Sequence, residues 1–108
     1  MEKEVIFYRT RDGREPFAQW FSSLEDKILK SRVLARTERI RQGNYGDHKR
    51  FHGIVELRFH LGKGYRVYCG EASDGVVVLL VGGDKSSQDS DIKLALKYWR
   101  DHYEQKEE

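Results

Sequence analysis

The segment at residues 76–81 is continuously apolar (VVVLLV), and it constrains the fold more than any other part of the sequence. A strand without polar alternation is typical of the centre of a sheet, where both faces are covered. The two preceding segments, residues 54–61 and 65–70, instead alternate apolar and polar side chains, as strands with one buried face do. Turns containing glycine separate these three segments, which predicts an antiparallel meander of three strands.

The rest of the chain predicts one more strand and three helices. Residues 4–9 are rich in β-prone side chains, and Pro16 suits the first turn of a helix. Apolar residues at helical spacing predict a second helix over about residues 25–42. A final helix is expected after a loop at residues 82–87.

These elements define an expected architecture. Their order is β-α-α-β-β-β-α, an α+β fold in which two N-terminal helices and a C-terminal helix pack on a mostly antiparallel four-stranded sheet. A length of 108 residues is enough for one modest hydrophobic core, so we expect a single domain over residues 1–108. The acidic tail at about residues 104–108 is expected to fray.

Cysteine content and hydropathy favour a cytoplasmic protein. Cys69 is the only cysteine, which excludes an internal disulfide and fits a reducing compartment. Charged residues stand at positions 2–4, where the apolar core of a signal peptide would begin. The longest apolar run, at residues 76–81, is too short to span a bilayer, so we expect no membrane association.

Basic residues are concentrated in the middle of the chain. Between Lys27 and Arg66 there are eleven basic and three acidic residues, a net charge of +8, whereas the whole chain carries only +2. Such a segregated basic segment favours a polyanionic partner, most commonly a nucleic acid. The alternative is a charged surface that contacts only solvent.

The hairpin between the two alternating strands gives the sharpest chemical hypothesis. A turn at residues 62–64 would pair Leu61 with Tyr65, and we expect Arg58 to lie opposite Arg66 on the polar face. Like charges at such a position destabilise a sheet, unless an anion binds there. Paired guanidinium groups match phosphate oxygens well, so the pair predicts a phosphate site. Alternatively, Glu56 and Tyr68 neutralise the pair and nothing binds.

Two loops carry further basic candidates. Lys85 follows the central strand and precedes a helix, where a lysine can help to hold a phosphate. His48, Lys49 and Arg50 lie in a polar loop at residues 44–53, which could close over a nucleic acid lying on the sheet. In both loops the alternative is a set of side chains exposed to solvent.

The histidines predict proton transfer rather than metal binding. The four histidines have no recognised zinc spacing with Cys69, so we expect no metal site and no cofactor. His60 shares the polar face with Arg58 and is the preferred general acid or base. Its alternative role is a surface imidazole beside the turn.

Four motifs occur in a fixed order along the chain. They are Gly46-Asp47-His48-Lys49, Glu56-Leu57-Arg58, Gly64-Tyr65-Arg66-Val67-Tyr68, and Gly82-Gly83-Asp84-Lys85-Ser86-Ser87-Gln88 followed by Asp91-Ile92. In this order and spacing the chain resembles the "addiction module killer" toxins, a HigB-like branch of the RelE/ParE superfamily. The resemblance covers nearly the whole chain.

The resemblance implies a RelE-like fold and the toxin of a type II toxin–antitoxin pair. Related toxins cut mRNA, often during its translation on the ribosome. The resemblance further implies a HigA-like helix-turn-helix antitoxin as partner, and contact with operator DNA only through that antitoxin. Position by position, the basic site residues of the family would be Lys49, Arg58, Arg66 and Lys85.

The implied activity is that of a metal-independent endoribonuclease. Arg58 and Arg66 would stabilise charge on the phosphate, Lys85 or Lys49 would orient it, and His60 or Tyr68 would transfer protons. Arg32, Arg36 and Arg39, at helical spacing, could meet RNA, ribosomal phosphates or an acidic antitoxin segment, although a helix face in contact only with solvent is our leading expectation. Two other functions remain open: a ParE-like toxin that binds DNA gyrase without cutting nucleic acid, and a nucleic-acid-binding module without catalysis.

Overall fold

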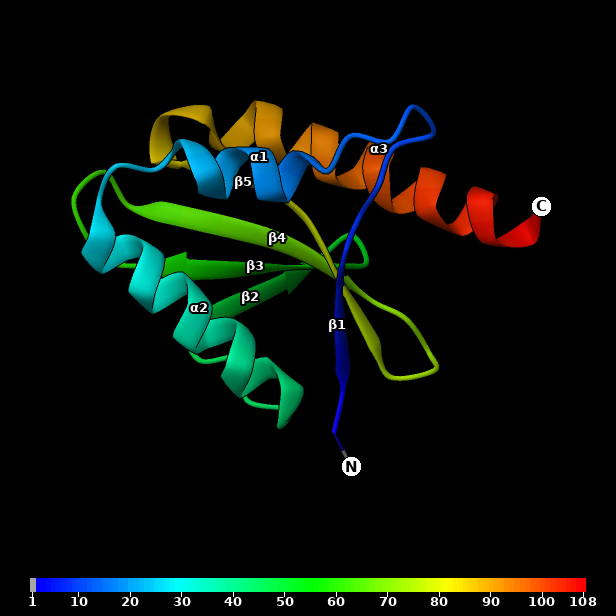
Figure 1. The fold of residues 1–108 in the computed structure, drawn as a ribbon, viewed down its shortest axis with the longest axis horizontal. Helices are drawn as coiled ribbons and strands as arrows, with labels where there is room; N and C mark the ends of the chain where they lie inside the picture. The colour runs from blue at the N-terminus through cyan, green and yellow to red at the C-terminus, as the bar shows by residue number, and fades with distance from the viewer. Residues whose placement is uncertain (1) are drawn as a thin grey trace.

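A computed structural model describes residues 2–108 of the chain (Figure 1). It contains five strands, one short 3-10 helix and three α-helices. They are β1 (Glu4–Phe7), α1 (Pro16–Ser23), α2 (Lys27–Arg41), β2 (His48–Phe51), β3 (Ile54–Phe59), β4 (Tyr65–Glu71), β5 (Val76–Asp84), the 3-10 helix η1 (Lys85–Ser87) and α3 (Gln88–Glu107). The expected α+β class is confirmed, and α3 continues to Glu107, well into the tail that was expected to fray.

The strands form one mixed sheet in the order β1-β5-β4-β3-β2. β1 pairs with β5 in parallel, and every other neighbouring pair is antiparallel. Residues 77–83 of β5 are all buried, as expected for a central strand. The meander of β3, β4 and β5 is therefore confirmed.

The prediction of four strands is wrong, because β2 lies inside the segment that was predicted to be a loop. Lys49 and Arg50 of β2 pair through the main chain with Glu56 and Val55 of β3. β2 is an edge strand, and its side chains are mostly exposed, so it carries no apolar alternation. Charged side chains on such an edge discourage pairing with other chains.

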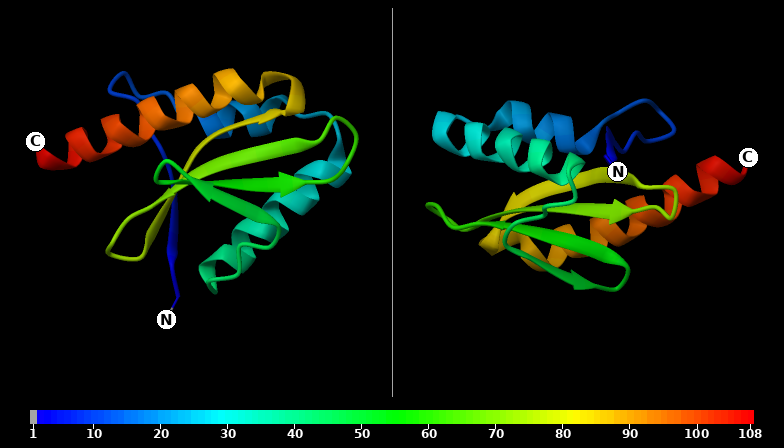
Figure 2. Two further views of the ribbon diagram at one scale, coloured as in Figure 1. Left: turned by 180° about the vertical axis from the view of Figure 1, so that it is seen from behind. Right: turned by 90° about the horizontal axis from the view of Figure 1, so that it is seen from below.

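Helices cover both faces of the sheet. Figure 2 shows α1 and α2 on one side and α3 on the other. The first core joins α1 and α2 to the side chains of Val55, Leu57 and Val67, among others, whereas the second joins α3 to Ile54 and Tyr68, among others. The sequence predicted that this second face of β3 and β4 is exposed to solvent. It is instead partly covered by α3, and Glu56 and Tyr68 are fully buried on it.

Close contacts with side chains of α1 and α3 explain the two glycines of β5, which were predicted to lie in a loop. A Cβ atom at Gly82 would overlap the ring of Trp20 in α1, and one at Gly83 would overlap the carboxylate of Asp91 in α3. Only glycine lets both helices approach the strand so closely. At the end of β5, the Asp84 carboxylate accepts a hydrogen bond from the Ser86 amide at 2.8 Å and caps the turn that leads into α3.

Across residues 2–108, each helix is too short or too polar to pass through a bilayer.

Candidate functional site

The β3–β4 hairpin places two arginines directly opposite each other. Arg58 pairs with Arg66, as the sequence predicted, but the next pair toward the turn is Phe59 with Tyr65. The expected pairing of Leu61 with Tyr65 is therefore wrong, because β3 ends at Phe59 and residues 60–64 all belong to the turn. The Leu61 amide there bonds back to the Phe59 carbonyl at 3.0 Å, and the Gly64 amide bonds to the Leu61 carbonyl at 2.9 Å.

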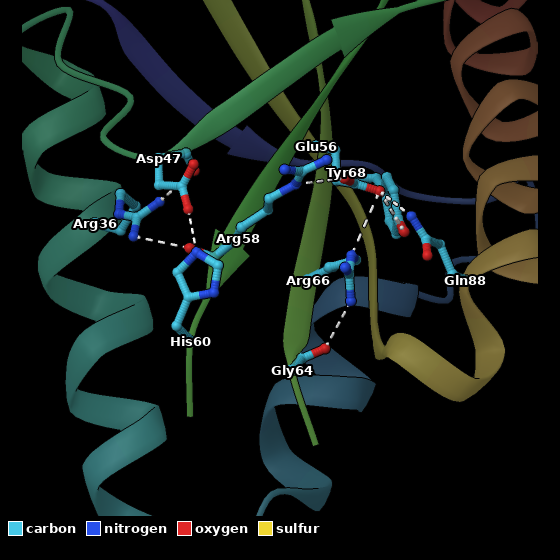
Figure 3. Close-up of polar contacts among 9 residues, drawn as sticks. All are labelled: Arg36, Asp47, Glu56, Arg58, His60, Gly64, Arg66, Tyr68 and Gln88. Atoms are coloured by element: carbon cyan, nitrogen blue, oxygen red, sulfur yellow. Dashed lines mark hydrogen bonds and ion pairs between the residues drawn. The ribbon is translucent and has the colours of Figure 1, made fainter. Parts of the chain in front are cut away.

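A buried carboxylate, that of Glu56, holds the arginine pair in place (Figure 3). Its Oε1 accepts a hydrogen bond from Arg58 Nε at 3.0 Å. Its Oε2 accepts one from the Tyr68 hydroxyl and one from Gln88 Nε2, each at 3.0 Å. Arg66 Nε lies 3.7 Å from the same oxygen. We call Glu56 and these four partners the hub. It links β3, β4 and α3 around one negative charge.

Both arginines turn their Nε atoms toward Glu56. Their other nitrogens are arranged differently, since Arg66 Nη1 donates to the Gly64 carbonyl at 2.9 Å, while no hydrogen bond within residues 2–108 involves the terminal nitrogens of Arg58. Side-chain exposure is 33% for Arg58 and 14% for Arg66. The sequence left open that Glu56 and Tyr68 neutralise the arginine pair. Because one carboxylate faces two guanidinium groups, one positive charge remains unbalanced.

Arg66 opens onto a surface hollow of about 440 Å³, which we call the phosphate hollow. His60, Lys63, Gly64 and Lys85 also line it. Lys85 reaches it from η1, directly after the Asp84 cap. The structure therefore brings together three predicted site residues, Arg66, Lys85 and His60, and adds Lys63 to them.

His60 carries a carboxylate partner that the sequence did not reveal. Its Nε2 is hydrogen-bonded to Asp47 Oδ2, and this bond lowers the pKa of Asp47 (Figure 3). The His60 side chain is 76% exposed, so its other ring nitrogen is free to meet a ligand. A carboxylate that orients an imidazole is a common arrangement for proton transfer.

Tyr68 does not fit the role of acid or base that was expected of it. Its side chain is fully buried beneath α3 rather than facing solvent, and its hydroxyl is committed to Glu56. Burial and the neighbouring Glu56 carboxylate raise the pKa of Tyr68. Its contribution is to fix the position of Glu56.

The three basic residues of β2 point to different faces of the sheet. Lys49 is opposite Glu56 and lines a second hollow of about 270 Å³ together with Arg58. Arg50 instead pairs with Glu71, and its guanidinium lies 5.0 Å from the centre of the Tyr45 ring. His48 Nδ1 lies 2.8 Å from the Gly46 carbonyl oxygen. Of this group, the structure brings only Lys49 to the arginine pair.

The basic stripe on α2 lies on the opposite side of the sheet from the arginine pair. Arg36 is not an exposed residue of that stripe, because its guanidinium donates to the carbonyls of Tyr45 (3.2 Å), Asp47 (3.1 Å) and Arg58 (3.0 Å). It also stacks over the Phe59 ring at 4.5 Å, so its role is structural. Arg32 and Arg39 remain exposed on the helix.

Sequence reasoning missed the residues that organise the site. Glu56 was considered only as a group that could neutralise the arginine pair and not as the residue that positions it, Gln88 was given no place in the site, and Asp47 was not paired with His60. The signal for Glu56 was its position two residues before Arg58, which puts both side chains on one face of a strand. No group of three histidine, cysteine or carboxylate side chains among residues 2–108 is arranged to hold a metal ion.

A comparison with known proteins places the chain in a family. An uncharacterized protein of Haemophilus influenzae is 48% identical over 80 residues, which are 73% of this chain and 81% of that protein. The chain therefore belongs to the same family as the Haemophilus protein. No protein-family model matches it, and no solved structure matches it either.

Proposed function

We propose that this chain is the toxin of a type II toxin–antitoxin pair, of the HigB-like branch of the RelE/ParE superfamily, and that it cleaves mRNA in the cytoplasm. One observation carries the proposal: Arg58 and Arg66 lie side by side on one face, fixed by a shared buried carboxylate and only partly neutralised by it. Phosphate is the ligand that such preorganised guanidinium groups fit best. The motif resemblance and the α+β arrangement of two N-terminal helices and a C-terminal helix around a meander support the RelE-like assignment.

The reaction proposed is an internal phosphoryl transfer within RNA. His60, oriented by Asp47, removes the proton from a ribose 2′-OH, and the 2′ oxygen forms a bond to the adjacent phosphorus. The bond from phosphorus to the 5′ oxygen then breaks, and that oxygen takes a proton from Lys85. The products are a 2′,3′-cyclic phosphate and a 5′-OH end, and no metal ion is required. Arg66 and Arg58 stabilise the extra negative charge of the transition state.

Partners follow from the same proposal. A helix-turn-helix antitoxin would hold the toxin inactive and would carry the complex to operator DNA, and translating ribosomes would present the mRNA. Co-expression of the antitoxin gene should then restore growth.

The test is expression of Arg66→Ala without an antitoxin. Removal of one stabilising donor should raise the barrier by roughly 2 to 4 kcal/mol, so growth arrest and transcript cleavage should both be lost. Arg32→Ala, an exposed arginine on the far side of the sheet, is the matched control and should remain toxic. Primer extension on cellular RNA measures the cleavage ends.

Three results would count against the proposal. Arg66→Ala that still cuts transcripts would remove the arginine pair from the mechanism. DNA breaks with intact transcripts would favour a gyrase poison of the ParE type. RNA binding without cleavage or growth arrest would favour a non-catalytic module.

A further inference from the structure

The second hollow, of about 270 Å³, lies beside the arginine pair but outside the phosphate hollow. Its lining differs in kind, because it combines an aromatic ring, an aliphatic side chain and polar groups. They are Phe51 and His52 at the tip of the β2–β3 hairpin, Lys49, Glu56, Arg58, and Gln88 and Ile92 of α3. Its volume is close to the lower end of the range for small-molecule sites, about 300 to 1,000 Å³, which suits one flat ring system rather than a peptide segment.

The hairpin tip that forms the aromatic wall is a tight turn. Phe51 pairs with Ile54, so His52 and Gly53 alone make the turn. Both have positive φ, 51° and 80°, which is the backbone of a tight two-residue hairpin turn. Lys49 Nζ lies 5.9 Å from the centre of the Phe51 ring. An aromatic face and a flexible cation are therefore held at the same hollow.

Gln88 supplies a fixed polar group on the facing wall. Its Nε2 is committed to Glu56 at 3.0 Å, and Figure 3 shows its side-chain oxygen pointing away from that carboxylate. No hydrogen bond within residues 2–108 involves this oxygen. The hub therefore fixes an acceptor that has no partner among the residues that the structure describes.

The two hollows lie on either side of the arginine pair. Arg58 lines the second hollow and Arg66 lines the phosphate hollow, and the two residues are direct cross-strand partners. A phosphate held between Arg58 and Arg66 would thus lie beside the hollow that Phe51 and Gln88 line.

From this geometry we propose that the second hollow binds one nucleobase of the RNA, stacked on Phe51 and read by Gln88. The inference rests on the proposed function, because it assigns a subsite to the same substrate. Gln88 accepts a hydrogen bond from an exocyclic amino group, so cytosine is favoured over uracil, which presents an oxygen at that edge. A base–aromatic stack is worth about 5- to 150-fold in affinity, and a neutral hydrogen bond about 2- to 12-fold.

The test is calorimetric titration of the full chain with three probes: cytidine 5′-monophosphate, uridine 5′-monophosphate and ribose 5-phosphate. Both nucleotides should bind at least fivefold more tightly than ribose 5-phosphate, and cytidine monophosphate 2- to 12-fold more tightly than uridine monophosphate. Phe51→Ala should remove the advantage of both nucleotides over the sugar phosphate. Gln88→Met should bring the cytidine-to-uridine ratio close to one, whereas Gln42→Met, an exposed glutamine at the end of α2, should leave that ratio unchanged.

The outcomes separate this inference from the proposed function. Equal affinity of the wild-type chain for all three probes, or unchanged preferences in Phe51→Ala, would overturn the base subsite even if RNA is cut. Base-dependent binding without any cleavage of RNA would leave the subsite standing and would overturn the proposed nuclease. Because the wild-type comparison alone can refute the inference, it does not depend on Gln88→Met folding normally.

Discussion

Glu56 is a charged side chain with no exposed surface. Hydrogen-bond donors around its carboxylate offset the cost of burying it. Arg58, Tyr68 and Gln88 each donate a hydrogen bond to it. Taking a carboxylate out of water costs several kcal/mol, and a buried ion pair often returns little more than that cost. The net effect of the hub is therefore on geometry: it fixes where the guanidinium groups point more than it stabilises the fold.

Replacement of Glu56 by alanine should nevertheless be severe. The change leaves Arg58, Tyr68 and Gln88 without their acceptor, and breaking a buried pair from one side typically costs about 3 to 5 kcal/mol. The free energy of unfolding, measured with urea, should fall by about that amount. Glu38→Ala is the matched control: it breaks an exposed pair with Arg41 (3.4 Å) and should cost about 1 kcal/mol or less. Equal losses of unfolding free energy in Glu56→Ala and Glu38→Ala would show that disrupting the hub costs no more than breaking an exposed ion pair.

At the scale of elements, close approach of helices to the sheet depends on glycines in the strands. Gly82 faces the Trp20 ring of α1, and Gly70 faces the Trp99 ring of α3. Neither glycine has a positive φ, so backbone strain is not the reason for glycine at these positions. The reason is space, because a methyl group would force an indole ring out of its position.

Gly82→Ala should therefore destabilise the protein through overpacking. We expect the free energy of unfolding to fall by about 1 to 3 kcal/mol. In a Trp20→Leu background the same change should cost less, because a smaller side chain leaves room for the added methyl group. A double-mutant cycle by urea unfolding measures the difference. Additive losses would mean that Trp20 is not the obstacle.

The elements differ in how far the sequence could predict them. β3, β4 and β5 follow from side-chain periodicity, because a buried face leaves its pattern in the residues. β2 could not be predicted in this way: its residues 48–50 are exposed, and the pairing with β3 uses only main-chain atoms. The expected hairpin register, Leu61 with Tyr65, would set Arg58 opposite Tyr68, so the opposition of Arg58 and Arg66 was stated correctly but did not follow from that register. The burial of Glu56 and Tyr68 could not be predicted. That burial depends on which sheet face α3 covers, and the sequence of α3 does not specify this.

At the scale of the whole molecule, the sheet separates two basic surfaces that are mixed along the sequence. One side carries Arg58, Arg66, Lys49 and Lys85, and the other carries the exposed arginines of α2, Arg32 and Arg39. The concentration of charge between residues 27 and 66 is thus divided in space, and the first surface has two hollows lined by its basic residues.

This division predicts different salt dependences for RNA binding. Each contact with a phosphate of single-stranded RNA contributes about 0.7 to the slope of log affinity against log salt concentration. Arg58→Ala should reduce that slope by about 0.7, and Arg39→Ala should leave it unchanged. Fluorescence anisotropy with a labelled oligonucleotide, over a series of salt concentrations, measures both slopes. Equal reductions would mean that RNA contacts both sides of the protein.

The parallel pairing of β1 with β5 joins the two ends of the sheet-forming sequence. During synthesis, β1 leaves the ribosome first and has no strand to pair with until β5 has been made. The parallel pairing therefore forms only after most of the residues between β1 and β5 have been synthesised. Such long-range pairing slows folding. Chains interrupted before residue 76 lack the strand that carries Lys85 into place, so a prematurely terminated product has no phosphate hollow.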